Sequence, residues 1–356
     1  MKKFLALILI AIFIAVLFSG CKSKSTTTPT PSPSPATTTT PSPSATPATS
    51  PAGKVKTGIA VITSLSKSMD AGEADGLAQV DSSIVAVTVG ADGKIAKCAI
   101  DGVQTKINFS ATGKLITPAN TVIQTKKELG DSYGMKSASG IGKEWYEQAA
   151  VLAKYVQGKT AAEVKGIAVD EERHATGSDL KASVTISIGG FIDAIDKAVS
   201  NAKDYGASSA DKLSIGVVTN MNKSTSAGEN DGLAEAYSTY VAVTTDAGGK
   251  ITSCIIDASQ GDVNFDTNGK IKTDLSAPVS TKNELGDAYG MKSASKIGKE
   301  WYEQAAAFAE YVTGKTATEV EGIAVDTENH ATGTDLKASV TISIGDFKAA
   351  LAKAAA

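Results

Sequence analysis

Hydrophobic and polar positions change their period several times between residues 58 and 202. Short apolar, β-branched runs at 58–63, 82–89 and 95–100 are typical of strands. The last two runs flank the turn Ala91-Asp-Gly-Lys94, which predicts a hairpin. A second short hairpin is predicted at 108–116, with Thr112-Gly113 at its tip. This part of the chain therefore predicts a small, mostly antiparallel sheet.

The period then lengthens to that of a helix. Four apolar residues recur every three or four positions, namely Trp145, Ala149, Leu152 and Val156. The pattern predicts a helix that Ser139 caps and Gly158 ends. Thr160 and Glu163 have the spacing of a capping box, which predicts a short second helix. Residues 191–202 are amphipathic and predict a final helix.

Residues 180–188, LKASVTISI, alternate between apolar and polar positions and predict a strand. Its polar face would present the hydroxyls of Ser183, Thr185 and Ser187. A helix is expected to begin just after them, near Gly189, and free backbone N–H groups at such an end bind phosphate. The alternative is a half-exposed edge strand whose outer face is simply polar.

The whole pattern occurs twice. From residue 57 onward the sequence recurs 156 positions later without a gap, so that HATGSDLKASVTISIG at 174–189 returns as HATGTDLKASVTISIG at 330–345. Strands come first and helices later in each copy, which predicts the α+β class with two tandem similar domains. The expected division is a first repeat at 54–203, a linker at 204–212 and a second repeat at 213–356.

The first 53 residues differ in composition from the repeats. Residues 1–20 have two lysines, a 15-residue apolar run and small residues before Cys21, as in a lipoprotein-type signal peptide. Cys21 would then carry a diacyl anchor. Residues 21–53 are rich in Ser, Thr and Pro and predict a disordered tether. The expected location is the extracytoplasmic face of a bacterial cell membrane; the alternative is an ordinary secretory signal.

Charge and cysteine content exclude several classes of function. Beyond residue 52 the chain has 31 basic and 38 acidic residues, with a single arginine, Arg173. Nucleic-acid binding needs clustered basic residues, so a nucleic-acid partner is not expected. Cys98 and Cys254 are repeat equivalents in strand-like runs, each alone in its copy. Core packing is the expected role of both, against a redox thiol.

Few residues offer catalytic chemistry. The chain has two histidines, His174 and His330, one in each copy, and no zinc-type cysteine spacing, so no metal site is predicted. It has no P-loop, no nucleophile elbow and no dinucleotide-binding glycine motif after a strand. His174 is expected to be a solvated loop residue. An electron carrier or a binding protein is thus a better expectation than a catalyst.

One family resemblance emerges from the order of these features. The chain has Asp92-Gly-Lys94 in the predicted turn, Glu128-Leu-Gly130 in a polar loop and Trp145 in the helix. Gly158-Lys159 ends that helix, and Asp179 precedes Thr185 by six residues. This series resembles the FMN-binding domain of flavinylated electron-transfer proteins. In both copies the family's Ser-Gly-Ala-Thr reads Ala-Ser-Val-Thr.

The resemblance implies a cofactor, FMN, which in the family is joined to the final Thr through a phosphoester bond. The residues it implies for cofactor binding occur in equivalent sets in the two copies: Glu128, Asp179, Ser183, Thr185 and Ser187, and Glu284, Asp335, Ser339, Thr341 and Ser343. In this reading the chain is a cell-surface lipoprotein that carries flavin for extracytoplasmic electron transfer. Its partners would be the membrane, through the lipid anchor, and redox proteins. The alternative is a cofactor-free binding or structural lipoprotein of the same fold.

Overall fold

The computed structural model of the protein describes residues 53–355. The expected signal peptide, Cys21 and the tether up to residue 52 lie outside these residues. Within the described part of the chain, no helix is both long enough and apolar enough to cross a membrane.

The first half begins with three antiparallel strands in the order β1-β2-β3. The hairpin predicted around Asp92 is confirmed, since it joins β2 to β3, and an isolated bridge from Phe109 to Leu115 forms the second hairpin. Helices occupy the C-terminal part of this half, as expected. The elements are β1 (Lys56–Ser64), β2 (Gly76–Val89), β3 (Ile95–Phe109), α1 (Lys126–Leu129), η1 (Gly130–Tyr133), α2 (Trp145–Tyr155), α3 (Ala161–Lys165), α4 (Ser178–Lys181) and α5 (Gly189–Ser200).

The second half repeats this order, so the α+β class with two similar halves is confirmed. Its strands also form one antiparallel sheet, in the order β4-β5-β6. The elements are β4 (Lys212–Asn220), β5 (Gly232–Thr245), β6 (Ile251–Phe265), α6 (Lys282–Leu285), η2 (Gly286–Tyr289), α7 (Trp301–Val312), α8 (Ala317–Glu321), α9 (Thr334–Lys337) and α10 (Gly345–Ala355). The segment between the halves pairs with the start of the chain's first strand, through Val55 N to Ala207 O and Thr57 N to Lys203 O.

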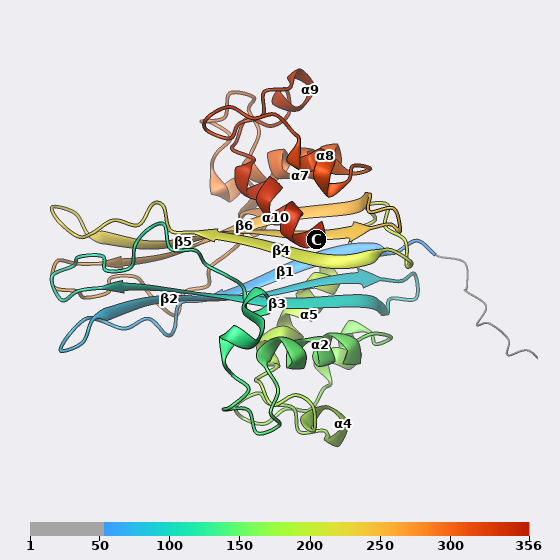
Figure 1. Ribbon diagram of the computed structural model, residues 1–356, viewed down its shortest axis with the longest axis horizontal. Helices are drawn as coiled ribbons and strands as arrows, with labels where there is room; N and C mark the ends of the chain where they lie inside the picture. The colour runs from blue at the N-terminus through green and yellow to red at the C-terminus, as the bar shows by residue number, and fades with distance from the viewer. Residues whose placement is uncertain (1–52, 356) are drawn as a thin grey trace, which may run out of the picture. The chain divides into compact units, whose positions relative to one another are not determined.

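The two sheets pack on each other, and the helices cover their outer faces (Figure 1). An inner core between the sheets includes Ile59, Ile84, Val217 and Tyr240. Each sheet also has an outer core under its own helices, centred on Trp145 in the first half and on its counterpart in the second. The central strands β2 and β5 are therefore buried over most of their length, and β2 and β3 extend beyond the apolar runs seen in the sequence.

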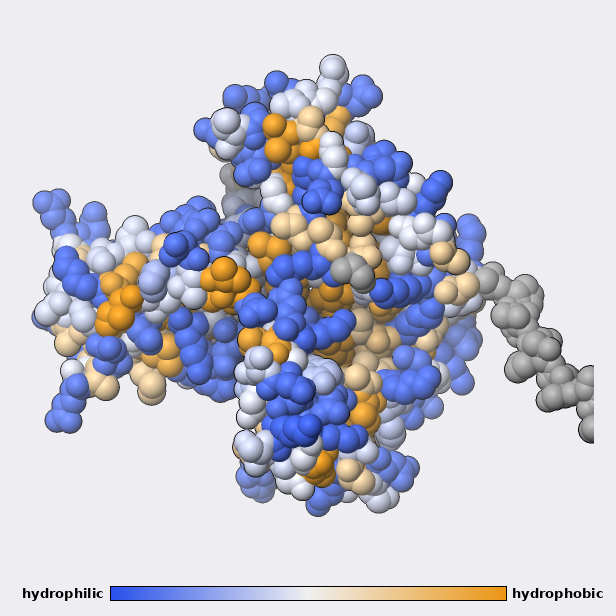
Figure 2. Space-filling view, viewed as in Figure 1, coloured by the Kyte–Doolittle hydropathy of each residue, from blue (hydrophilic) through white to orange (hydrophobic). Residues whose placement is uncertain are grey.

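Equivalent residues of the two halves meet in pairs, as in a two-fold interface. The rings of Phe109 and Phe265, which occupy the same position in the two repeats, stack with centroids 4.1 Å apart. Ala71 N donates to Gly269 O, and its counterpart Ala227 N donates to Gly113 O, each at 2.8 Å. The halves thus contact each other as two protomers of a symmetric dimer would. Hydrophilic side chains predominate on the face in Figure 2, and hydrophobic ones form separate patches.

The strand predicted at 180–188 is wrong. Residues 178–181 form the one-turn helix α4, and the chain then runs irregularly to α5. Leu180, Val184 and Ile188 are buried, whereas Ala182 is exposed and Ile186 only partly covered. The apolar positions that pack are therefore four apart, and the strict alternation in the sequence has no counterpart in the burial.

The predicted start of the central helix is also wrong. α2 begins at Trp145, and Glu144 rather than Ser139 is its N-cap, in a capping box with Glu147. The predicted apolar face is confirmed, because the side chains of Trp145, Ala149, Leu152 and Val156 are all buried. The capping box of Thr160 and Glu163 at α3 is confirmed, as is the final helix α5.

Candidate functional site

Each half has a cavity between the C-terminal end of its long central helix and the short helices that follow it. These are α2, α3 and α4 in the first half and α7, α8 and α9 in the second. In the first half it encloses about 460 Å³ and is lined by Tyr155, Lys159, Glu163, Gly166, Ile167, Ala168, Ala175, Gly177 and Leu180. In the second half it encloses about 320 Å³, and the residues that line it, among them Tyr311 and Lys315, are repeat equivalents of these. Both volumes fall in the range of small-molecule sites.

A tyrosine ring, a lysine amine and an apolar floor define each cavity. Lys159 Nζ lies 4.4 Å from the ring centroid of Tyr155, and the equivalent distance from Lys315 to Tyr311 is 4.5 Å. Buried Leu180 and Leu336 lie at the floors. A ring that can stack and an amine that can pair with an anion suit a ligand with a flat conjugated part and an acidic group.

The acidic residue of the cavity is engaged elsewhere. Glu163 Oε2 accepts from the backbone N–H of Thr160 at 2.7 Å, so it completes the cap of α3. This hydrogen bond holds the pKa of the Glu163 carboxyl below its usual range, and the same holds for Glu319. The carboxylate is therefore structural, which leaves the lysine amine as the cavity's recognition group.

The hydroxyls predicted to share one strand face do not do so. Thr185 is held by the buried side chain of Gln148, whose Oε1 accepts from Thr185 N at 2.7 Å and from Thr185 Oγ1 at 3.2 Å. Ser187 forms a bridge with His174, and Ser183 N donates to Leu180 O. None of the three side chains lines the cavity. Thr341, Ser343 and Ser339 repeat this arrangement around Gln304.

The two predicted aspartates lie close to the cavities. Asp179 is exposed on α4, between the cavity residues Gly177 and Leu180, and Asp335 is exposed at the same place on α9. Neither is itself among the lining residues. Of the residues in the family resemblance, Lys159 and its repeat equivalent Lys315 line the cavities, whereas the Ser and Thr hydroxyls do not.

The two predicted glutamates instead join the halves. Glu128 Oε1 forms an ion pair with Lys353 Nζ at 2.7 Å, and Glu284 forms the reciprocal ion pair with Lys197. Both glutamates also complete capping boxes, with Thr125 and Thr281. Their carboxylates are therefore part of the contact between the repeats rather than of either cavity.

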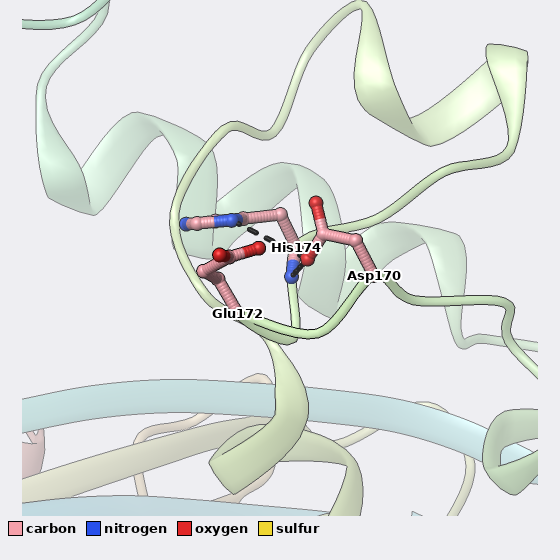
Figure 3. A group of neighbouring side chains, drawn as sticks. All are labelled: Asp170, Glu172 and His174. Carbon is pink, nitrogen blue, oxygen red and sulfur yellow. Dashed lines mark hydrogen bonds and ion pairs between the residues drawn. The ribbon is translucent and has the colours of Figure 1, made fainter.

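An acidic turn beside the cavity brings together Asp170, Glu172 and His174 (Figure 3). Asp170 Oδ1 accepts from the backbone N–H of His174 at 2.7 Å, and the imidazole Nδ1 lies 3.5 Å from the same carboxylate. Their ligand atoms lie within 4.8 Å of one another, with the two acidic residues exposed and His174 partly buried. The hydrogen bonds account for the arrangement as a tight turn, and the predicted solvated His174 fits this position.

Two features of these sites were missed by the sequence reasoning. Gln148 and Gln304 are fully buried on the apolar faces of α2 and α7. Each connects its helix by hydrogen bonds to the segment that contains Thr185 or Thr341. The sequence does contain a signal for them, because a glutamine interrupts the apolar face of the helix next to Ala149 and the same glutamine occurs in both copies. The cavity tyrosines were missed because helical spacing placed them at the edge of that face.

Comparison with known proteins gives little further information. No family model matches the chain, and no solved structure matches it. A chlorophenol reductase of Desulfitobacterium hafniense is 56% identical over 41 residues, which make up 12% of this chain and 12% of that protein. A match of this length does not establish a family.

Proposed function

We propose that the chain is a lipid-anchored, extracytoplasmic carrier of flavin mononucleotide, with one flavin in the cavity of each half. The duplicated Tyr–Lys cavity is the observation that carries this function, because it occurs in both repeats with equivalent lining residues. The signal peptide expected at residues 1–20, followed by Cys21, supports the location. The resemblance of the turn, loop and helix-end residues to FMN-binding domains supports the choice of ligand.

Different cavity residues would contact different parts of such a ligand. The ring of Tyr155 offers a face against which an isoalloxazine can stack, and Lys159 offers positive charge for the phosphate. Leu180 and Ala175 provide the apolar floor that excludes water from one side of the ring. FMN supplies the redox chemistry when bound, and the protein holds and orients it.

One observation favours the alternative, a cofactor-free binding lipoprotein. The lysine amine already lies over the tyrosine ring in both halves, so a stacked ligand must displace it. A protein or peptide partner with an acidic side chain would need only the amine at the rim. The spectrum of the purified protein separates the two functions, since the alternative predicts a colourless protein that does not bind FMN.

The test is to express the full chain in a bacterium that exports it and makes a flavin transferase, and to record its visible spectrum and intact mass. We expect a yellow protein with up to two FMN per chain. Tyr155→Ala with Tyr311→Ala should release flavin that is held without a covalent bond, whereas Asp75→Asn, at an exposed position outside both cavities, should not.

The covalent bond implied by the family resemblance is tested in the same preparation. If FMN is attached, the mass rises by one or two FMN units and falls back in Thr185→Ala with Thr341→Ala. If FMN is bound without a bond, the colour is lost on denaturation and these threonine changes leave it intact. A colourless protein of unmodified mass that also fails to bind added FMN overturns the proposed function.

A further inference from the structure

A lysine is buried in the second half without an anionic partner. Lys282, at the first position of α6, is 4% exposed. Its Nζ donates to the Tyr237 hydroxyl at 2.9 Å and lies 4.5 Å and 5.0 Å from the ring centroids of Tyr289 and Trp301. None of the ion pairs found among the described residues includes Lys282. Burial raises the pKa of Tyr237, so the hydroxyl that accepts from the lysine stays neutral.

The same lysine lines a cavity of about 320 Å³, a volume in the range of small-molecule sites. Gln260 connects this cavity to the aromatic rings around Lys282. It lines the cavity, lies opposite Tyr237 in the sheet register and accepts from the Tyr289 hydroxyl at 3.4 Å. The apolar wall of the cavity consists of Leu65, Ala277, Pro278, Val279 and Leu285.

The polar part of the lining favours an uncharged ligand. It has two carboxyl groups, those of Asp262 and Asp274, and the side chains of Thr273 and Ser280. The carboxylates disfavour an anion in the cavity, and the ammonium of Lys282 disfavours a cation. A neutral molecule that the lysine amine can attack fits this combination of groups.

The environment of Lys282 makes its amine available as a nucleophile. Burial, and next the charge of Lys223, lower the pKa of Lys282 to about 8, although the charges of Glu235 and Asp257 oppose this shift. Glu235 lies opposite Asp262 in the sheet register. At pH 7 about a tenth of the amine is then unprotonated, whereas an ordinary lysine amine is almost entirely protonated. Lysines that are desolvated or lie near a second cation are the ones that attack carbonyl carbons in proteins.

We propose that Lys282 condenses reversibly with a small, uncharged aldehyde in this cavity and so forms an imine. The amine nitrogen attacks the carbonyl carbon, and a C=N bond replaces the C=O bond. The carbonyl oxygen leaves as water with the two amine hydrogens, so the step needs no oxidant or reductant. The apolar body of the aldehyde lies against Leu65, Val279 and Leu285.

The first half provides a matched control within the same chain. Lys126, the repeat equivalent of Lys282, lies 5.0 Å and 5.2 Å from the ring centroids of Tyr133 and Trp145. It is less buried than Lys282 and does not line this cavity. Reactivity that comes from the aromatic rings alone should therefore appear at both lysines, and reactivity that depends on the cavity should appear only at Lys282.

The test is reductive labelling of the full chain with butanal and sodium cyanoborohydride at pH 7, followed by peptide mass mapping. Reduction traps the imine as an N-butyl lysine. We expect Lys282 to be labelled at least tenfold faster than Lys126, with a rate that saturates as the butanal concentration rises. Glyoxylate, an anionic aldehyde, should lose this preference for Lys282 over Lys126.

Two further variants test whether the cavity is needed. Leu285→Asn makes the apolar wall polar and should slow the labelling of Lys282 at least fivefold. Leu129→Asn, the same change in the first half, should leave it unchanged. Lys282→Arg should abolish the fast, saturable labelling.

Labelling of Lys282 no faster than that of Lys126 overturns the proposal. A rate at Lys282 that rises with butanal without saturating also overturns it, because the aldehyde would then react without being bound first. Both comparisons use the unmodified chain, so they remain decisive even if a variant does not fold.

Discussion

At the residue scale, burial determines which carboxyl groups titrate near neutral pH. Asp257 is buried and hydrogen-bonded to the backbone of Ala258 and Asn283, and burial raises its pKa to about 6. Asp262 reaches a similar value beside Glu235. Both pKa values are higher in the folded state than in the unfolded chain, where 3.8 is usual. The folded state therefore holds more protons between pH 4 and pH 6.

This difference in proton binding predicts the pH dependence of stability. A raised carboxyl pKa stabilises the folded state at low pH, and this contribution is lost as the pH rises from about 4 through about 6. We expect Asp262→Asn to remove part of this slope and to raise the free energy of unfolding at pH 7.5 by about 1–2 kcal/mol, after allowance for solvent screening. Urea unfolding at pH 4, 5, 6 and 7.5 measures it.

The control is Asp75→Asn, which removes an exposed carboxyl outside the Glu235–Asp262 pair. A variant Asp262→Asn whose stability follows the same pH profile as the unmodified chain would contradict the raised pKa. Asp257 remains in that variant, so a residual slope between pH 4 and pH 6 is expected.

At the element scale, α2 is attached to the irregular segment that follows α4 by one side chain. Gln148 Oε1 accepts from the backbone N–H groups of Thr185 and Ile186, and its Nε2 donates to Ser139 Oγ and Lys143 O. The Gln148 side chain thus forms hydrogen bonds to two loops, one before α2 and one after α4.

We expect Gln148→Leu to lower the free energy of unfolding by about 1–3 kcal/mol, because it leaves two partly buried N–H groups without their acceptor. Chemical denaturation monitored by circular dichroism measures the loss. Gln304→Leu, the same change in the other half, should lose a similar amount because Gln304 accepts from Thr341 in the same way. Unchanged stability in both variants would contradict this prediction, because it would show that the segments around Thr185 and Thr341 do not depend on the glutamine hydrogen bonds.

The segment 180–188, which contains Thr185, shows why the predicted strand was wrong. Leu180, Val184 and Ile188 fit a period of two as well as a period of four, so alternation alone could not distinguish a strand from a one-turn helix with an irregular continuation. The hairpin at Asp92 and the capping box at Thr160 were predictable because each depends on residues within four positions. The cavities were not, because their lining residues are spread over 155–180, further apart than the four positions over which these local signals act.

At the scale of the whole molecule, a second core that both sheets share makes each repeat depend on the other. Phe109 and Phe265 are fully buried against each other, and Gly261 leaves room for Val80 of the opposite half, since a Cβ there would lie 2.5 Å from its Cγ1. The sequence indicated two similar domains but contained no local signal that their sheets would share a core. Strand faces buried on both sides carry no alternation by which to detect it.

We expect Phe109→Ala to lower the free energy of unfolding by about 3–5 kcal/mol and to destabilise both halves in one transition. Phe265→Ala should cost a similar amount, and the double variant should cost less than the sum because the two rings contact each other. Fluorescence and far-ultraviolet circular dichroism should give coincident unfolding curves. Two separate transitions would contradict a shared core.

The ion pairs between the halves are expected to contribute much less. Lys353 and Glu128 are partly exposed, as are Lys197 and Glu284. Lys353→Ala should therefore change the free energy of unfolding by about 0.2–1 kcal/mol, and less in high salt. Denaturation of this variant in low and high salt gives the comparison with Phe109→Ala. A loss as large as that of the phenylalanine would contradict this ranking.

The stack of Phe109 on its own repeat counterpart has an evolutionary consequence. In a homodimer of a single repeat, both rings would be the same residue of one gene, and every substitution would appear on both sides of the axis. Tandem duplication removes this constraint, so one copy can have Glu235 and Asp262 where the other has Gln79 and Lys106. Fusion of the two copies into one chain is thus what permits a symmetric fold to carry an asymmetric charge.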